Sequence, residues 1–271
     1  ICGTWLPLRM VGEFFVHRGA FHDAGACCDT MDGHLLWDKT RGNGIVRVLA
    51  IVPAYNEEEC LANTVRELTS TCPDVDYLVV NDGSSDATPR ICDELALNHI
   101  DLPVNCGLTS AVKAGMKYAL RHGYDAAVQI DSDGQHIPEY IPTMAKTLEE
   151  EGADIVIASR NLAGGGAVGA RGAGAKLITA IIHQTTGATI TDPTSGMRMY
   201  NRAMIERLAR GFDLAPEPDT IALLIRRGAK VIEVPAEMRE RQGGTSYLHF
   251  MSSISYMART CLSILLFQWF R

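Results

Sequence analysis

Residues 48–71 read VLAIVPAYNEEECLANTVRELTST, and they set the pattern for most of the chain. Five apolar residues, 48–52, predict a buried strand that ends at Pro53. Apolar residues at helical spacing then predict a helix from Glu57 to about Thr71, with Asn56 as its cap and Glu59 placed as in a capping box. A strand that leads directly into a helix is the repeating unit of α/β folds.

The same unit recurs along the chain. Further strands are expected at 77–80, 102–104, 126–130 and 155–158, and helices at 86–97, 108–121 and 137–151. These strands are apolar on both faces, which is typical of a parallel sheet covered by helices. We therefore predict an α/β fold, with a Rossmann-like, mostly parallel sheet flanked by helices in a single domain.

Composition sets the limits of this domain. The chain has 271 residues, enough for one large core, and its formal net charge of −7 argues against broad nucleic-acid binding. Eight cysteines at irregular spacing predict reduced thiols.

We place the domain at 45–246, after an irregular extension at 1–44 to which we assign no function. Residues 247–271 are expected to form an amphipathic helix that lies on a membrane, docks on the domain or binds a membrane protein, because their apolar run is shorter than the roughly 20 residues of a spanning helix.

Polar side chains gather where the predicted strands end. The segments concerned are 53–58, 81–86, 131–135 and 159–160. Each one alone could be an ordinary turn or helix start, but ligands in such sheets bind beyond the carboxyl ends of the strands. Asp131 and Asp133 are two residues apart at such an end, so both carboxylates can reach one Mg²⁺ or Mn²⁺ ion. A metal there would neutralise a diphosphate leaving group.

Six segments in order resemble one family. They are PAYNEE (53–58), NDGSSD (81–86), NCGLTSAVKAG (105–115), QIDSDGQH (129–136), DPTSGMRMYNR (192–202) and EVPAEMRERQGGTSY (233–247). Together they resemble the family 2 glycosyltransferases of GT-A fold, most of all the branch with dolichol-phosphate mannose synthases and bacterial polyprenyl-phosphate glycosyltransferases. The resemblance covers about residues 46–250. It implies a metal-dependent, inverting transfer of a sugar from a nucleotide-sugar donor.

The resemblance also assigns residues to the donor. The residues implied to bind the nucleotide sugar are Pro53, Ala54, Tyr55, Glu57, Asp82, Ser84, Asn105, Gly107, Asp131, Ser132 and Asp133. Asp131, Asp133 and Gln135 are implied to hold the metal ion. Asp131 and Asp133 thus join Arg160 and Asp192 as the candidate catalytic residues.

The acceptor side is expected to be basic. The residues implied to bind the acceptor phosphate or the diphosphate are Arg160, Arg171, Arg198, Arg239, Arg241 and Ser246. Relatives often have a serine where this chain has Ala175, and the glycine- and alanine-rich stretch 163–175 is interpreted as a mobile loop. Asp192 and Ser195 are candidates to close over the sugar, while Glu217 and Asp219 either contact sugar hydroxyls or simply favour a helix start.

The predicted function is therefore sugar transfer from a UDP- or GDP-sugar to a polyprenyl phosphate, at the cytoplasmic face of a membrane. A phosphate acceptor is already an anion, whereas a saccharide hydroxyl would need a general base, for which Asp192 and Asp219 are the candidates. Transfer to a saccharide and non-catalytic binding of a nucleotide sugar stay open as alternatives. A nucleotidyltransferase is disfavoured, because a basic glycine-rich loop is expected after its first strand and PAYNEE is acidic.

Overall fold

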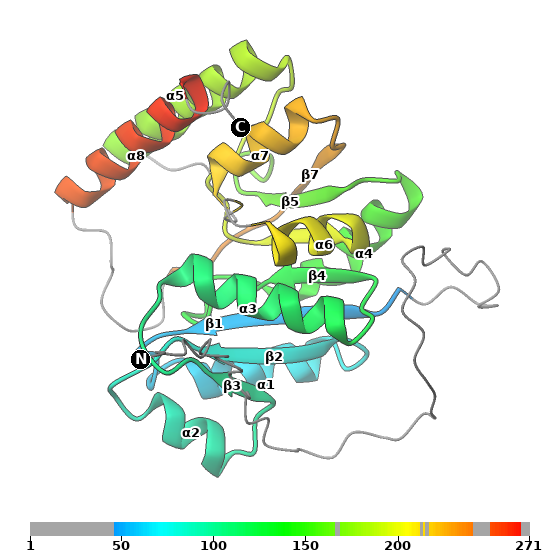
Figure 1. Ribbon diagram of the computed structural model, residues 1–271, viewed down its shortest axis with the longest axis vertical. Helices are drawn as coiled ribbons and strands as arrows, with labels where there is room; N and C mark the ends of the chain where they lie inside the picture. Colours follow the sequence, from blue (N-terminus) through cyan, green and yellow to red (C-terminus); the bar gives the residue numbers. More distant parts are fainter. Residues whose placement is uncertain (1–45, 166–168, 212–213, 215–216, 241–249, 267–271) are drawn as a thin grey trace, which may run out of the picture.

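The computed structural model describes residues 46–165, 169–211, 214, 217–240 and 250–266 (Figure 1). Its sheet has seven strands in the order β3-β2-β1-β4-β6-β5-β7. They are β1 (Val48–Ala54), β2 (Asp76–Asn81), β3 (His99–Asp101), β4 (Ala126–Gln129), β5 (Ile155–Ser159), β6 (Arg198–Asn201) and β7 (Val231–Pro235). Only β6 runs antiparallel to its neighbours, β4 and β5, so the prediction of a mostly parallel sheet is confirmed.

Helices cover both faces of this sheet. They are α1 (Leu61–Thr71), α2 (Thr88–Glu94), α3 (Leu108–Arg121), the short 3-10 helix η1 (Pro138–Tyr140), α4 (Ile141–Glu150), α5 (Gly169–Thr186), α6 (Arg202–Arg210), α7 (Pro218–Arg226) and α8 (Phe250–Leu265). Successive side chains of a strand point to opposite faces. Leu49 and Ile51 of β1 therefore pack with α3 and α6, while Val48, Ala50 and Val52 pack with α1 and α4. Each face thus has its own buried apolar core.

The strand ends come together because of the parallel register. β1 pairs with β2 as far as Ala54 opposite Asn81, and with β4 as far as Ile51 opposite Gln129. The carboxyl ends of these three strands therefore meet at one edge of the sheet, as Figure 1 lets the reader follow. The polar segments after β1, β2 and β4 all leave from that edge.

Three local predictions are wrong. The third strand is His99–Asp101 and not 102–104, since Pro103 has no N–H with which to extend a strand ladder. The first helix begins at Leu61, and Asn56 does not cap it. Asn56 has φ +54, and its Oδ1 instead accepts a hydrogen bond from Ser85 N at 2.8 Å, which joins the loops after β1 and β2.

The stretch 163–175 is also not a loop throughout, because α5 begins at Gly169. Alanine favours helix, and a small residue lets another helix approach closely. A Cβ on Gly174 would lie 1.6 Å from the Sδ atom of Met257 in α8, so the glycine admits this side chain. Figure 1 shows α5 and α8 side by side, which agrees with the packing of Met257.

The described part of α8 is tied to the domain. Ile264 is buried in the core cluster that includes α5 and α7, and the Ser263 hydroxyl donates to Asp219 Oδ2 of α7 at 2.6 Å. Within the described residues, no helix has the length and apolar character needed to cross a bilayer. Leucines of α5, of α8 and of the position directly after α8 remain exposed, and they are Leu177, Leu262, Leu265 and Leu266.

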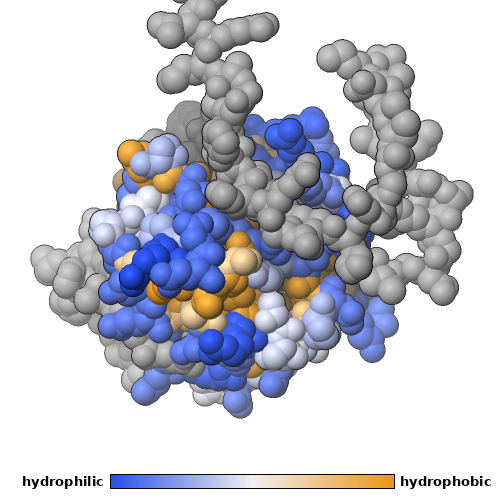
Figure 2. Space-filling model, turned by 90° about the horizontal axis from the view of Figure 1, so that it is seen from below, coloured by the Kyte–Doolittle hydropathy of each residue, from blue (hydrophilic) through white to orange (hydrophobic). Residues whose placement is uncertain are grey.

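The opposite end of the molecule carries α2 and β3. Figure 2 looks at this end and shows apolar side chains gathered between hydrophilic ones. Exposed apolar residues of the α2–α3 region are Leu95, Val104 and Leu108. Val104 and Leu108 flank the predicted donor residues Asn105 and Gly107, so apolar surface borders that side of the candidate site.

Candidate active site

The predicted donor segments meet at the edge of the sheet. The Ser132 hydroxyl donates to Pro53 O at 2.9 Å, which ties the loop after β4 to the end of β1. The backbone N–H of Asn56 donates to Ser84 Oγ at 3.0 Å, which ties the end of β1 to the loop after β2. Residues that are about 30 to 80 positions apart in sequence are thereby fixed against one another.

Asp82 holds the loop in front of α3. It is only 3% exposed, and its Oδ1 and Oδ2 accept from the backbone N–H groups of Cys106 at 2.8 Å and Gly107 at 2.7 Å. The neighbouring Gly83 has φ +66, and a Cβ there would lie 2.5 Å from the carbonyl carbon of Val104. The carboxylate predicted to meet the nucleobase therefore also fixes the shape of its surroundings.

The other predicted donor residues differ in exposure. Pro53, Ala54, Glu57, Ser132 and Asp133 are buried, Tyr55, Ser84 and Gly107 are half-buried, and Asn105 is exposed. Ser132 uses its hydroxyl on Pro53 O, so its role in this structure is to join two loops.

The two carboxylates after β4 are each oriented by neighbours. Asp131 Oδ1 accepts from Gln129 Nε2 at 2.9 Å, and Asp133 Oδ1 accepts from the backbone N–H of Gln135 at 3.1 Å. The Gln135 side chain donates to Arg239 O at 3.2 Å, and Arg239 N donates back to Gln135 O at 3.1 Å. The segment after β7 is therefore pinned beside the acidic loop.

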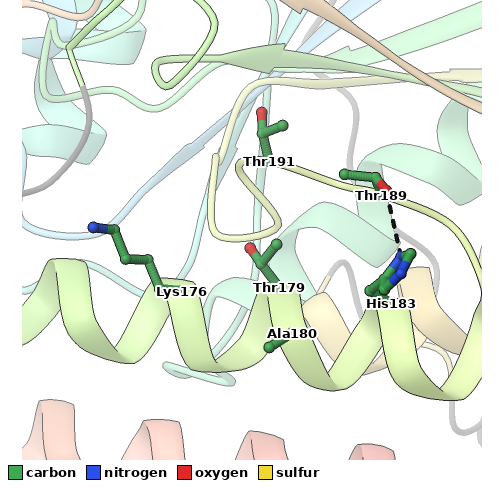
Figure 3. A pocket seen from close by; sticks show the side chains of 6 residues that line it. All are labelled: Lys176, Thr179, Ala180, His183, Thr189 and Thr191. Atoms are coloured by element: carbon green, nitrogen blue, oxygen red, sulfur yellow. Dashed lines mark hydrogen bonds between the residues drawn. The ribbon is translucent and has the colours of Figure 1, made fainter.

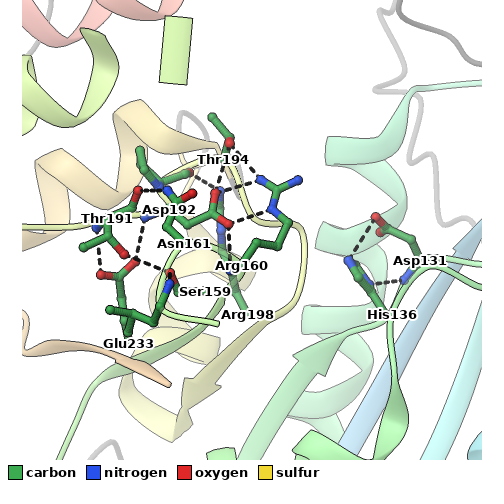
Figure 4. A network of polar contacts seen from close by, with 12 residues as sticks. Asp131, His136, Ser159, Arg160, Asn161, Thr191, Asp192, Thr194, Arg198 and Glu233 are labelled. Carbon is green, nitrogen blue, oxygen red and sulfur yellow. Dashed lines mark hydrogen bonds and ion pairs between the residues drawn. The ribbon is translucent and has the colours of Figure 1, made fainter. Parts of the chain in front are cut away.

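His136 is a site residue that the sequence analysis did not single out. Its ring is 4% exposed and accepts from Asp131 N through Nδ1 at 2.9 Å, while Nε2 lies 3.6 Å from Asp131 Oδ2 (Figure 4). A Cβ on Gly196 would lie 2.8 Å from the same Oδ2 atom and 3.0 Å from His136 Cε1. The sequence signal for His136 is its position directly after Gln135, which is a predicted metal ligand.

These residues suit a hard divalent cation together with a diphosphate. Among the described residues, no group of three or more His, Cys, Asp or Glu side chains is arranged to hold a metal ion. Mg²⁺ is commonly bound by one or two carboxylates plus substrate phosphates rather than by a complete protein cage. The glycine at 196 leaves open the space beside Asp131 Oδ2 that a side chain would fill. The donor set of Asp131 and Asp133 is thus chemically appropriate.

Arg160 and Asp192 form the central ion pair of the other half of the site. Arg160 Nε and Nη2 each donate to the Asp192 carboxylate at 2.7 Å, and Nη2 also donates to Thr194 Oγ1 at 3.0 Å (Figure 4). The Arg160 side chain is 27% exposed, whereas Asp192 is 1% exposed. A forked pair of this kind fixes the plane of the guanidinium.

The environment keeps Asp192 ionised. Burial alone would raise its pKa, but hydrogen bonds from Arg160, its positive charge and the Thr194 hydroxyl together lower the pKa below the usual value. Glu233 of β7 supports the arrangement, because its carboxylate accepts from the backbone N–H groups of Thr191 and Asp192, each at 2.7 Å. Glu233 was not predicted, since nothing in its strand indicates a partner on a distant loop.

Of the remaining predicted basic residues, the structure describes the side chains of Arg198 and Arg239, and these bind different partners. Arg198 is 3% exposed and donates to Pro193 O at 2.7 Å, so it supports the 192–196 loop through the loop's backbone. The Arg239 guanidinium binds Glu67 of α1 at 2.7 and 2.9 Å. Arg241, Ser246 and the side chain of Arg171 lie outside the described part of the structure.

The carboxylate of Asp219 is also engaged. Its Oδ1 accepts from Thr220 N at 2.9 Å and its Oδ2 from the Ser263 hydroxyl at 2.6 Å. Both candidate general bases therefore already serve as acceptors within the protein. Glu217 is the N-cap residue of α7, in agreement with the helix-start interpretation, and Ser195 is fully buried.

A groove of about 380 Å³ adjoins the Arg160 network (Figure 3). Its lining residues are Lys176, Thr179, Ala180 and His183 of α5, with Thr189 and Thr191 from the segment that follows. Thr191 belongs to both features, because its hydroxyl is 2.8 Å from Ser159 Oγ beside Arg160. The groove thus lies between α5 and the segment that leads into Asp192.

Comparison with known proteins gives the class of this molecule. The model of the glycosyl transferase family 2 matches residues 49–209, more than half of the chain. The chain is 34% identical over 215 residues to the polyprenol monophosphomannose synthase of Mycolicibacterium smegmatis, which covers 74% of this chain and 80% of the relative. It is also 34% identical over 218 residues to the undecaprenyl-phosphate mannosyltransferase of Micrococcus luteus, covering 74% and 87% of the two chains.

A solved structure agrees with the fold. The glucosyl-3-phosphoglycerate synthase of Mycobacterium tuberculosis, in complex with Mn²⁺, uridine diphosphate and phosphoglyceric acid, superimposes with a TM-score of 0.61 over 82% of this chain and 78% of that one, at 18% identity. This likeness confirms the GT-A type of fold. The chain belongs to glycosyl transferase family 2 and is a glycosyltransferase.

Proposed function

We propose that this glycosyltransferase moves a sugar from a UDP- or GDP-sugar to a polyprenyl phosphate, with Mg²⁺ or Mn²⁺ held at Asp131 and Asp133. The observation that carries the proposal is the pairing of two sub-sites at one edge of the sheet. One is the acidic loop after β4, and the other is the Arg160 fork oriented by Asp192. The names of the two similar proteins, which act on polyprenol or undecaprenyl phosphate, agree with this assignment.

On the donor side, the chain binds and orients the nucleotide. The segment 53–57, in which Pro53, Ala54 and Glu57 are buried, and the Asp82-anchored loop at 106–107 form walls for the base and ribose. A divalent cation bound by Asp131 and Asp133 would neutralise the departing diphosphate. The residues around them do the positioning, because Gln129 and His136 hold Asp131 while the Gln135 backbone holds Asp133.

On the acceptor side, Arg160 binds an anion. Nε and Nη2 are used by Asp192, and among the described residues Nη1 has no hydrogen-bond partner, so it can donate to a phosphate oxygen. That oxygen forms the new bond to the anomeric carbon as the bond to the nucleoside diphosphate breaks, with inversion of configuration. The acceptor phosphate has no proton to give up in this step.

A saccharide hydroxyl acceptor is disfavoured by the same geometry. It would need a carboxylate to take its proton. Asp192 is bound to Arg160 through both oxygens and has a lowered pKa, which makes it a poor proton acceptor. Asp219 already accepts two hydrogen bonds. Non-catalytic binding is disfavoured because the carboxylates expected to hold the metal are both present.

The α5–α8 pair suits an acceptor that resides in a bilayer. The four exposed leucines of α5, α8 and the position after α8 are between 44% and 54% exposed, and the groove beside α5 is lined by Thr191, whose hydroxyl contacts Ser159 next to Arg160. Amphipathic helices of this type lie in the membrane interface with their apolar face inward. We propose that the protein meets the membrane surface through this pair.

The test is release of nucleoside diphosphate from a panel of UDP- and GDP-sugars. Each donor is assayed with Mn²⁺ or Mg²⁺, with and without a short polyprenyl phosphate. We expect release that needs both metal and lipid phosphate, and the active donor identifies the sugar. Metal-dependent release that lipid phosphate does not change, but a saccharide increases, would contradict the acceptor assignment. Tight donor binding without release from any donor would favour the binding-only alternative.

A further inference from the structure

His136 lies beside Asp131 and can hold the orientation of its carboxylate. Its ring is almost completely buried, yet both of its nitrogens face the same residue: Nδ1 accepts from Asp131 N at 2.9 Å, and Nε2 lies 3.6 Å from Asp131 Oδ2. A ring that served only to fill the core would not need both nitrogens directed at one carboxylate-bearing residue. Figure 4 shows the pair opposite the Arg160 network.

The hydrogen bond to Nδ1 determines which ring nitrogen of neutral His136 carries the proton. A backbone N–H can only donate, so Nδ1 of His136 must present its lone pair to Asp131 N. In the neutral ring the proton is then on Nε2, directed at Asp131 Oδ2. A nitrogen that carries a proton cannot ligate a metal ion. His136 therefore acts on Asp131 and does not coordinate the cation itself.

Gly196 lies close to both members of this pair. A Cβ there would lie 2.8 Å from Asp131 Oδ2 and 3.2 Å from His136 Nε2, both tighter than ordinary contact. Asp131 Oδ1 is meanwhile held by Gln129 at 2.9 Å. The carboxylate is thus held at Oδ1 by a hydrogen bond from Gln129, while His136 Nε2 lies 3.6 Å from Oδ2 and the glycine at 196 keeps any side chain out of the space beside that oxygen.

We propose that His136 is the positioning residue of the donor site, which fixes the Asp131 carboxylate through its Nε2–H for binding of a divalent cation with a nucleoside diphosphate. The inference rests on the proposed metal dependence. Carboxylates that bind metals are themselves commonly held by hydrogen bonds, and loss of such a partner typically weakens metal affinity by about 10- to 100-fold.

The experiment compares three variants that remove the hydrogen-bonding groups of the two ring nitrogens separately or together. His136→Asn keeps an acceptor near the position of Nδ1 and removes Nε2–H, His136→Gln places an amide N–H near Nε2, and His136→Ala removes both. His99 provides the control, because it is another buried histidine whose Nε2 faces the carboxylates of Asp93 and Asp101, away from the acidic loop. His99→Asn is expected to leave metal binding unchanged.

The readout is Mn²⁺ affinity at saturating UDP or GDP, measured by electron paramagnetic resonance, with thermal unfolding to verify that each variant folds. We expect about 10- to 100-fold weaker binding for His136→Asn and His136→Ala, and recovery to within a few-fold for His136→Gln. Pulsed resonance of the bound Mn²⁺ should show no directly coordinated nitrogen. A coordinated nitrogen, or unchanged affinity in folded His136→Asn, would overturn the inference.

The two proposals fail in different ways. If wild-type protein binds no Mn²⁺ or Mg²⁺ with any nucleoside diphosphate, the metal assignment itself is wrong, and the inference about His136 falls with it. If wild-type protein binds the metal and the His136 variants equal it, only the positioning role is wrong. If His136→Asn does not fold, the recovery expected for His136→Gln still decides the question.

Discussion

Replacing Asp192 by Asn tests whether this residue acts through Arg160. The substitution keeps the size of the side chain but removes the charge and turns one acceptor into a donor that faces the guanidinium. Two charge-assisted hydrogen bonds of 2.7 Å are affected, and hydrogen bonds to charged groups contribute about 1.5–3 kcal/mol. Because Asp192 is 1% exposed, we expect the free energy of unfolding to fall by about 2–3 kcal/mol. Arg160 then loses its orientation, and kcat/KM for the lipid phosphate should fall by about 100-fold.

The assay is a double-mutant cycle. Nucleoside diphosphate release is measured for wild type, Arg160→Ala, Asp192→Asn and the double variant, together with urea unfolding of each. If Asp192 only orients Arg160, the double variant should be no slower than Arg160→Ala alone. Thr194→Val is the matched control, because it leaves the forked ion pair in place and removes only the two longer bonds of the Thr194 hydroxyl, from Arg160 at 3.0 Å and to Asp192 at 3.1 Å. It should therefore cost less than Asp192→Asn in both unfolding free energy and kcat/KM. Losses that multiply in the double variant would show that Asp192 has a separate part in the chemistry and would refute this reasoning.

Three further predictions concern the same site. Asp133→Ala should abolish metal-dependent turnover while circular dichroism shows an intact fold, and normal turnover would contradict the metal assignment. Gly196→Ala, whose Cβ would lie 2.8 Å from Asp131 Oδ2, should weaken Mn²⁺ affinity about tenfold, whereas Gly165→Ala, with its nearest neighbour at 3.7 Å, should not. The lowered pKa of Asp192 contributes stability above the ordinary value of about 3.9 that is lost as the pH falls through the lowered value. Asp192→Asn should therefore lose less unfolding free energy than wild type between about pH 5 and pH 3, and an equal loss would exclude this linkage.

The sheet and its polar edge could be predicted because their causes are local in sequence. Apolar runs such as 48–52 must be buried on both faces, and the rule that parallel strands end together then places Asp82 and Asp131 at one edge. The spacing of Asp131 and Asp133 identified the metal candidates for the same reason. The family resemblance added Arg160 and Asp192, and the structure joins these two in one ion pair.

Other features depend on partners that no local pattern reveals. Asn56 has the composition of a helix cap, but its amide oxygen accepts from Ser85, which is 29 residues away. Glu233 lies in a strand and accepts from Thr191 and Asp192, which belong to a distant loop. The helical half of the stretch 163–175 depends on its packing against Met257. In each case tertiary contact overrides the local preference.

The segment 192–196 lies between the two halves of the site. At one end Asp192 holds Arg160 through both carboxylate oxygens, and at the other Gly196 lies beside Asp131 and His136, where a Cβ would come within 2.8 Å of Asp131 Oδ2. Only three residues lie between Asp192 and Gly196, and Arg198 supports the segment through a hydrogen bond to Pro193 O. An extended stretch of four residues spans at most about 14 Å, so this segment limits how far the arginine fork can lie from the carboxylate beside the donor. One short segment therefore places the proposed acceptor sub-site next to the proposed donor sub-site.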